Sequence, residues 1–344
     1  MKRLIARLLG RRRGNRSLEL QNVRSILVKP IGNAVGDSIV HLRHIAQLKK
    51  AFPLVKIGVL VTERSRLIYE NSNVVDVLIE DKVHNYFLQN SKWDVYLDFF
   101  PSFTTRSIML DAILNPKYVI NFGKKDKKYY NLSTVKNYDF FVDVPELLHF
   151  KDYLMYSPFS EYIDDSICYE IYIPSESENK VNHFWKRKEN IKILLNPQGS
   201  TRTLPAEELS LLLENTEDKG LEFIVTNTNN SEKYFAYLPE MSNLSLSPKT
   251  TLFEYFALIN SADIVISVDG GGVHVACACG KPLLAFYSNN QYTLSKWAPA
   301  PKENVSCLTL VGKNRSNDNN ETAGFDMNEA KQWLYTQIHH LRKR

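Results

Sequence analysis

A chain of 344 residues is longer than one hydrophobic core usually organises, so its length predicts two domains. Contents of 44% hydrophobic and 24% charged residues are typical of a globular enzyme, and no apolar run approaches the 18 residues of a membrane-spanning helix. The formal charge of +5 belongs to the first 16 residues, because the remainder holds 36 basic and 38 acidic side chains.

The leader, residues 1–20, begins with 16 residues that hold seven basic side chains and no acidic one. Four apolar residues recur at helical spacing among them: Leu4, Ile5, Leu8 and Leu9. This pattern predicts a short amphipathic helix on an anionic bilayer surface; a disordered basic leader is the alternative. Arg7 interrupts an apolar segment already too short for a signal peptide, and no aromatic-laced basic surface follows that would favour nucleic acid.

Short β-rich runs then alternate with helical stretches, which is typical of parallel α/β units. The strands expected in an N-terminal domain, residues 21–180, are residues 25–29, 56–61, 74–79, 95–99 and 118–121. Its expected helices are residues 38–51 and 107–114. Residues 123–180 show no clean period, and we expect them to close this domain and connect it to the next.

A second series follows in residues 181–325, with a C-terminal helix expected in residues 326–344. Its expected strands are residues 191–196, 222–226, 264–268 and 282–287. Its expected helices are residues 206–215, 252–260 and 273–279. Both series repeat the order strand, glycine loop, helix, so we expect two parallel sheets with a substrate at the carboxyl ends of their strands.

The first loop that could carry chemistry is residues 29–37 (KPIGNAVGD), which joins a strand to a helix. Gly32 and Gly36 permit tight turns, and Asp37 stands at the expected start of the helix. An aspartate there can cap the helix, which is worth about 1 kcal/mol, or take a proton from an attacking hydroxyl. The sequence leaves both roles open. The glycine spacing is not that of a dinucleotide-binding loop.

The second loop, residues 196–204 (NPQGSTRTL), gathers small residues with free backbone N–H groups and hydroxyls around Arg202. Such a set suits a phosphate, and a solvated turn is the alternative. The third loop, residues 269–274 (DGGGVH), opens a helix of small residues. Its glycines let a ligand approach the backbone and the helix amino end. His274 either binds phosphate or ribose or is a core histidine.

Four cysteines are present: Cys168, Cys277, Cys279 and Cys307. Cys277 and Cys279 are too close together for a credible zinc site and lack a second pair and histidines. We therefore expect these cysteines to be reduced thiols in a cytoplasmic protein.

Together the three loops resemble those of glycosyltransferase family 9, the ADP-heptose heptosyltransferases of bacterial lipopolysaccharide synthesis. The segment SILVKPIGNAVGDSIVHLRHIAQLKKAFP is similar to the family's first strand, Gly-Asp loop and first helix, and VVDVLIE and WDVYLDF are similar to its next strands. NPQGSTRTLP resembles a shortened form of its donor loop, Pro-Gly-Ala…Lys-Arg-Trp-Pro. SVDGGGVHVACACGKPLLAFY resembles its Asp-Thr-Gly-x-x-His signature, small-residue helix and Gly-x-Pro. The resemblance covers about residues 24–122 and 191–300.

The resemblance implies an α/β fold of GT-B architecture, with two Rossmann-like domains whose parallel sheets face a cleft. Residues 21–180 would bind the acceptor and residues 181–325 the nucleotide sugar. Asp37 falls at the family's proposed catalytic base, and Arg202 falls near the lysine that offsets the diphosphate charge. The expected donor-binding residues are Ser200, Thr201, Arg202, Asp269, Gly270, Gly271, Gly272 and His274. The expected acceptor-binding residues are Gly36, Arg64 and Arg106.

The implied reaction is a single inverting displacement that needs no metal or other cofactor, because basic side chains and helix amino ends stabilise the leaving ADP. Heptose would pass from ADP-heptose to a lipid-anchored glycan of the lipopolysaccharide inner core. The enzyme would be cytoplasmic and peripheral on the inner leaflet of the bacterial inner membrane. Two departures bear on the donor: Gly270 replaces the usual threonine, and Leu204 replaces the tryptophan.

Three other readings stay open. A transferase of the same fold could use a hexose or aminosugar donor, and a non-catalytic protein could bind carbohydrate on the same scaffold. A nucleotide-sugar epimerase of similar architecture is disfavoured, because a small substrate needs no membrane-seeking leader.

Overall fold

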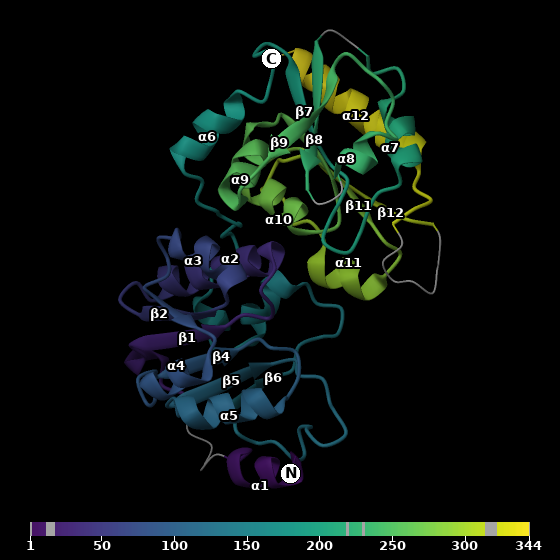
Figure 1. Cartoon of the computed structure of the whole chain (residues 1–344). Helices are drawn as coiled ribbons and strands as arrows, with labels where there is room; N and C mark the ends of the chain where they lie inside the picture. Colours follow the sequence, from purple (N-terminus) through teal and green to yellow (C-terminus); the bar gives the residue numbers. More distant parts are fainter. Residues whose placement is uncertain (1, 12–17, 218–219, 229–230, 314–321, 344) are drawn as a thin grey trace. The chain divides into compact units, whose positions relative to one another are not determined.

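The computed structural model describes residues 2–11, 18–217, 220–228, 231–313 and 322–343. The chain divides into two compact units, residues 1–167 and 168–344 (Figure 1). Each unit contains a six-stranded sheet in which every paired strand is parallel. The predicted α/β fold with two Rossmann-like sheets is confirmed.

The first unit has the strand order β3-β2-β1-β4-β5-β6. Its strands are β1 (Ser25–Lys29), β2 (Lys56–Val61), β3 (Val77–Glu80), β4 (Val95–Asp98), β5 (Tyr118–Phe122) and β6 (Phe140–Val142). Its helices are α1 (Lys2–Leu9), α2 (Val35–Ala51), α3 (Glu63–Glu70), α4 (Val83–Leu88) and α5 (Thr105–Leu114), with 3₁₀-helices η1 (Leu20–Asn22), η2 (Phe150–Tyr156) and η3 (Ser160–Tyr162). The chain leaves β1 in one direction and returns to it at β4, so the sheet has a topological switch point between these two strands.

The central strands of this unit are buried on both faces, as an apolar parallel strand requires. Residues of α4 and α5 pack with Leu27 and Tyr96 in one cluster, and α2 and α3 contact each other. Residues 123–167, which show no period in the sequence, supply β6, η2 and η3. Arg43 of α2 holds this segment in place, because its guanidinium donates to the carbonyls of Lys151 and Ile167 and pairs with Asp165.

The second unit has the strand order β12-β11-β10-β7-β8-β9, with its switch point between β7 and β10. Its strands are β7 (Ile191–Asn196), β8 (Leu221–Asn227), β9 (Leu244–Lys249), β10 (Ile264–Val268), β11 (Leu283–Tyr287) and β12 (Cys307–Val311). Its helices are α6 (Ser175–Asn182), α7 (Ala206–Leu213), α8 (Ser231–Phe235), α9 (Leu252–Ser261), α10 (Gly271–Ala278), α11 (Gln291–Trp297) and α12 (Met327–Arg342).

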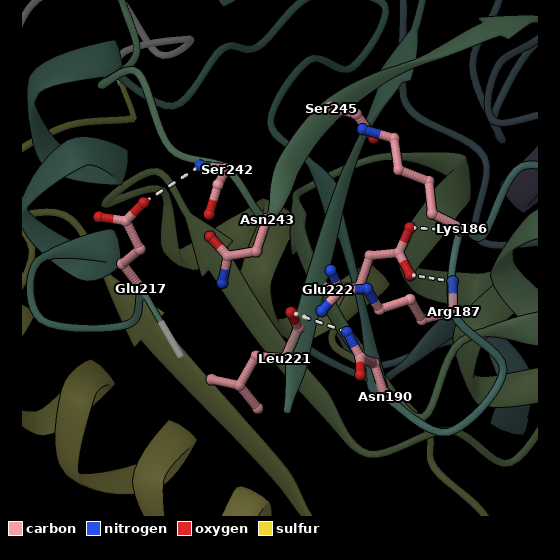
Figure 2. Close-up of a pocket in the computed structure, with 9 residues that line it drawn as sticks. All are labelled: Lys186, Arg187, Asn190, Glu217, Leu221, Glu222, Ser242, Asn243 and Ser245. Carbon is pink, nitrogen blue, oxygen red and sulfur yellow. Dashed lines mark hydrogen bonds between the residues drawn. The ribbon is translucent and has the colours of Figure 1, made fainter. Parts of the chain in front are cut away.

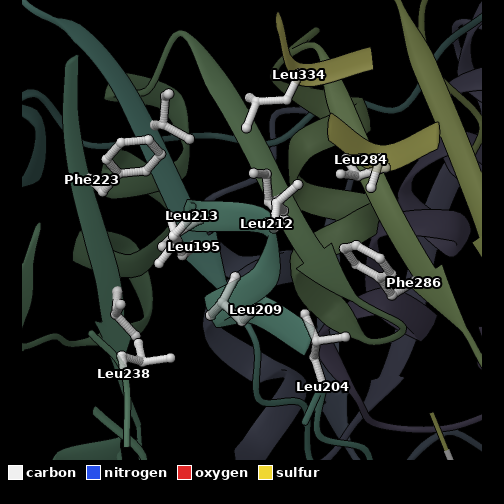
Figure 3. Close-up of a cluster of buried hydrophobic side chains, with 14 of the residues drawn as sticks. Leu195, Leu204, Leu209, Leu212, Leu213, Phe223, Leu238, Leu284, Phe286 and Leu334 are labelled. Atoms are coloured by element: carbon white, nitrogen blue, oxygen red, sulfur yellow. The ribbon is translucent and has the colours of Figure 1, made fainter. Parts of the chain in front are cut away.

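The main core of the second unit lies between its sheet and the helices α7 and α12 (Figure 3). Leu209 and Leu212 of α7 and Leu334 of α12 project toward sheet residues such as Leu195 and Phe286. Burial of this apolar surface stabilises the sheet and therefore fixes the loops at its carboxyl edge.

The N-terminal helix α1 packs against the first unit next to α5 (Figure 1). Ala6 is buried and Ile5 half-buried, whereas Leu4 and Leu8 are exposed. The four apolar residues of the leader therefore do not form one exposed face. Residues 12–17 of the leader lie outside the described residues. Within the described residues, no helix combines the length and the apolar character needed to cross a membrane.

Candidate donor and acceptor sites

The predicted donor loop follows β7, at the switch point of the second unit. Gly199 donates its backbone N–H to the Arg202 carbonyl at 2.8 Å, and Leu204 donates to the Pro197 carbonyl at 2.9 Å. These bonds close a tight turn whose tip, Ser200, is exposed. Thr201 is also exposed and accepts a 3.2 Å hydrogen bond from Arg202. The turn thus presents two hydroxyls and one guanidinium at the carboxyl edge of the sheet.

The glycine run follows β10, the strand that pairs with β7. A Cβ at Gly199 would lie 2.9 Å from the Asp269 carbonyl oxygen, so the two loops pack backbone against backbone. A Cβ at Gly272 would overlap the Asn196 amide and the Tyr255 hydroxyl. Gly270 is different, because its extended backbone suits any residue and its Cβ position meets nothing closer than 3.7 Å. Close packing therefore explains Gly272, whereas the half-exposed Gly270 and Gly271 leave backbone open to a ligand.

Arg202 and Asp269 connect the two loops. The Nε of Arg202 lies 3.0 Å from a carboxylate oxygen of Asp269, and their side chains are 16% and 8% exposed. These two buried atoms have no aligned hydrogen-bond partner among the described residues, so their contact is an ion pair only. Burial raises the pKa of Asp269 to about 6, against the opposing effect of Arg202. Unused hydrogen-bonding capacity at a buried ion pair is typical of a ligand site.

A buried polar network supports these loops from below. The Asn196 amide donates to the Ser267 hydroxyl at 2.9 Å and accepts from Thr226 at 2.8 Å. Tyr255, whose pKa is raised by burial, contacts the same amide. This network was not predicted from the sequence, where the available signal was that two predicted strands, residues 191–196 and 222–226, each end in a polar residue.

His274 is 3% exposed and lies inside the second unit. Its ring contacts Tyr169 and Trp297, with ring centroids 6.0 and 5.9 Å away. This environment favours the core role, one of the two roles that the sequence leaves open for His274.

Asp37 lies in the first turn of α2, which begins three residues earlier than predicted. Its carboxylate accepts a 3.0 Å hydrogen bond from the Ala34 backbone N–H, so the side chain does serve the helix start. Burial raises its pKa, while the Ala34 N–H and the charge of Arg64 act in the opposite direction. A half-buried carboxylate with a raised pKa is also suited to general-base catalysis. The two roles of Asp37 are compatible.

The predicted acceptor residues lie near the carboxyl edge of the first sheet. Gly36 is buried in the first turn of α2, and Arg64 is exposed in the first turn of α3, close enough to Asp37 to affect its pKa. Arg106, at the start of α5, donates to the Tyr86 hydroxyl at 2.9 Å and pairs with Asp81 at 3.1 Å. These three residues remain predictions for acceptor binding.

Lys29 and Asp81 form an ion pair that was not predicted from the sequence. Lys29 ends β1, and Asp81 follows β3. Burial of Asp81 is outweighed by Lys29, Tyr86 and Arg106, which hold its pKa below the ordinary value. The pair thus gives this edge of the sheet a fixed charged cluster. The available sequence signal was a lysine that ends one predicted strand, residues 25–29, and an aspartate two residues after another, residues 74–79.

A cavity of about 380 Å³ lies at the opposite edge of the second sheet (Figure 2). Glu222, near the amino end of β8, accepts hydrogen bonds from the backbone N–H groups of Lys186 and Arg187 at 2.7 and 3.2 Å. Ligands of doubly wound sheets bind at the carboxyl edge, so this cavity is not the donor site. The carboxylate instead ties the segment before β7 to the sheet.

Comparisons with known proteins identify the family of the chain. Residues 137–324, more than half of the chain, match the family model of glycosyltransferase family 9 (heptosyltransferase). A protein of Escherichia coli (strain K12) named "Putative lipopolysaccharide heptosyltransferase 4" is 25% identical over an alignment of 301 residues, and the match covers 80% of this chain and 78% of that protein.

Two solved structures share the fold. The ADP-heptose lipopolysaccharide heptosyltransferase II of E. coli superposes with a TM-score of 0.71 at 14% identity, covering 92% of this chain and 99% of that chain. A glycosyl transferase family 9 protein of Veillonella parvula DSM 2008 superposes with a TM-score of 0.70 at 16% identity, covering 92% and 97%. The chain therefore belongs to glycosyltransferase family 9 and is a heptosyltransferase-like enzyme with a GT-B-type fold.

Proposed function

We propose that this enzyme transfers heptose from ADP-heptose to a lipid-anchored glycan of the lipopolysaccharide inner core, with inversion at the anomeric carbon. The observation that carries the proposal is the buried Arg202–Asp269 pair at the β7/β10 switch point. Its two polar atoms without an aligned hydrogen bond and the half-exposed backbone of Gly270 and Gly271 suit a diphosphate joined to a sugar. The names of the E. coli relative and of the E. coli structure support the donor and the acceptor class.

In the proposed step the acceptor hydroxyl gives its proton to the Asp37 carboxylate. Its oxygen forms a bond to the anomeric carbon while the bond from that carbon to the phosphate oxygen breaks, and the electron pair leaves with ADP. Arg202 and the N–H groups at the start of α10 balance the charge of the departing diphosphate. In this proposal Asp269 accepts hydrogen bonds from hydroxyls of the donor sugar. Ser200 and Thr201 contribute hydroxyls to the phosphates.

The acceptor would bind at the carboxyl edge of the first sheet, where Arg64 and Arg106 supply positive charge. A lipid-anchored acceptor places the enzyme at the cytoplasmic face of the bacterial inner membrane. Its basic leader supports that location, because seven cations in 16 residues favour an anionic leaflet.

A hexose or aminosugar donor is the alternative, because Gly270 has no hydroxyl at the position where the family has threonine. A hexose or aminosugar linked to another nucleotide could use the space that a threonine side chain would fill. Slow nucleotide release from purified enzyme separates the cases: ADP released from ADP-heptose supports the proposal. Release from a UDP-linked sugar instead would transfer the proposal to that donor, and binding without any release or transfer would indicate a non-catalytic protein.

A further inference from the structure

A basic pocket lies between α1 and residues 128–136, the segment that crosses from β5 to β6. Its volume is about 670 Å³. Five of its lining side chains are cationic: Arg3, Arg7, Arg11, Lys128 and Lys136. None of the five forms an ion pair with a carboxylate in the part of the chain that the structure describes. Five uncompensated cations around one cavity repel each other, so an anion bound there would be stabilised.

The wall of this pocket is built into the fold. Ala6 is buried with Phe103 and Val135 in a small core cluster, and the Lys136 N–H donates to the Gly10 carbonyl at 2.7 Å. Tyr129, which also lines the pocket, has three cations near its ring: Lys2, Arg3 and Lys128 lie 6.0, 5.8 and 5.6 Å from the ring centroid. The aromatic face offsets part of their repulsion but supplies no net negative charge.

Exposed apolar residues adjoin the basic ones on α1. Arg3 and Arg7 are four residues apart and share one side of the helix, and Leu4 and Leu8 occupy the adjoining side. Leu4 is 56% exposed and Leu8 is 67% exposed. A soluble phosphate compound would need the cations but not these leucines. A bilayer uses both, because its head groups carry phosphate and its acyl boundary accepts apolar side chains.

We propose that this pocket binds the phosphate of an anionic membrane phospholipid, with Leu4 and Leu8 inserted at the edge of the acyl region. The leader then acts as a folded wall of a head-group site, not as a free helix lying on the surface. The inference rests on the proposed function in one respect: a lipid-anchored acceptor requires the enzyme to bind a membrane. It concerns a site far in sequence from both switch-point loops of the second unit.

The test uses full-length protein and sedimentation with vesicles of phosphatidylglycerol and phosphatidylcholine, with pure phosphatidylcholine vesicles for comparison. The pocket variant is Arg3→Gln/Arg7→Gln/Lys136→Gln, and all three substituted side chains are exposed.

The matched control variant, Lys92→Gln/Lys188→Gln/Lys233→Gln, removes the same charge from exposed lysines elsewhere. We expect the pocket variant to lose roughly fivefold in partitioning per cation, about a hundredfold in all, and the control to lose much less.

A third variant, Leu4→Ser/Leu8→Ser, should also weaken binding to anionic vesicles. Equal losses in the pocket variant and the control would overturn the proposal, since net charge alone would then explain binding. Full binding by the leucine variant, with complete displacement by inorganic phosphate, would overturn the bilayer assignment. Thermal melting of each variant measures whether it is folded. Because the assay contains neither donor nor acceptor, its failure leaves the proposed transfer reaction untouched.

Deletion of the leader is a poorer test. It would remove Ala6 from its contacts with Phe103, Ile108 and Val135 and expose that cluster. A loss of vesicle binding could then follow from damage to the first unit, whereas the exposed substitutions avoid this outcome.

Discussion

The Nε of Arg202 lies 3.0 Å from a carboxylate oxygen of Asp269, although 67 positions of sequence separate the two residues. The contact joins the loop after β7 to the loop after β10, at the switch point of the second sheet. The carboxylate is buried and its pKa is raised to about 6. The two side chains attract each other by charge, but the Nε of Arg202 and the facing oxygen of Asp269 form no aligned hydrogen bond. A diphosphate can therefore compete for the guanidinium at modest cost.

Arg202→Ala should weaken ADP binding about tenfold to a hundredfold, since hydrogen bonds to charged groups contribute about 1.5–3 kcal/mol. Arg202→Lys should fall between this variant and wild type, because lysine keeps the charge without the planar fork. Isothermal titration calorimetry with ADP measures all three. Arg187→Ala, which removes an exposed arginine at the opposite edge of the same sheet, is the matched control. Equal affinity in wild type and both Arg202 variants would remove Arg202 from the donor site.

Asp37→Asn should reduce turnover by about 10²–10⁴-fold, the usual contribution of a general base, with donor affinity nearly unchanged. The asparagine oxygen can still accept from the Ala34 N–H, so the start of α2 stays capped. Asp37→Ala should lose turnover equally and some stability in addition. Because the pKa of Asp37 is raised, the acidic limb of the wild-type rate profile should lie at a higher pH than an ordinary aspartate gives. Near-normal turnover of Asp37→Asn would disprove the catalytic role.

Gly272→Ala should destabilise the second unit by about 1–3 kcal/mol, because its methyl group would overlap the Asn196 amide and the Tyr255 hydroxyl. Gly270→Ala should fold normally, since its backbone is extended and its Cβ position is open. Thermal melting of both variants compares the two positions within one helix start. If the two variants melted at the same temperature, the close packing around Gly272 would not contribute to the stability of the second unit.

Asp269 makes stability depend on pH. Its pKa rises from the ordinary 3.8 to about 6 on folding, so the folded state binds the proton more tightly than the unfolded state. The contribution of Asp269 to the free energy of unfolding is therefore fully present below the ordinary pKa and is lost as pH rises through about 6, a change of roughly 3 kcal/mol. Urea unfolding of wild type and Asp269→Asn measures the difference. We expect the difference in free energy of unfolding between wild type and Asp269→Asn to change between about pH 4 and pH 6 and to stay constant at higher pH. A difference that does not depend on pH would contradict the argument that burial raises the pKa of Asp269.

Apolar runs bounded by turn residues were enough to predict β1, β2, β7 and β10 with their observed bounds. Helix starts were less accurate. The helix over residues 38–51 begins at Val35, because Asp37 serves the helix from inside its first turn and not from the cap position. The helix predicted from residue 273 begins at Gly271, since glycine counts against a helix in sequence although packing around Gly272 requires it.

Long-range contacts set the remaining structure. Val74 and Val75 suggested a strand from residue 74, but β3 begins at Val77, after Asp76 accepts a hydrogen bond from the Ile57 N–H. The conformation of residues 123–167 depends on contacts with residues far away in the sequence, such as Arg43. The hydrophobic pattern within such a segment does not indicate which distant residue it contacts.

The candidate site was predictable as a set of loops, because each loop followed an apolar strand and held residues suited to phosphate or proton transfer. The pairing of Arg202 with Asp269 required the strand order, which places β7 beside β10. The Lys29–Asp81 pair likewise depends on the order β3-β2-β1 and was not predicted.

The most direct test of the proposed function is mass spectrometry of a lipid-anchored inner-core acceptor after incubation with ADP-heptose and enzyme. We predict that wild type adds one heptosyl residue with release of one ADP, and that Asp37→Asn, folded and still able to bind ADP, adds none. An unchanged acceptor with wild-type enzyme, or a sugar added only from another nucleotide donor, would contradict the account.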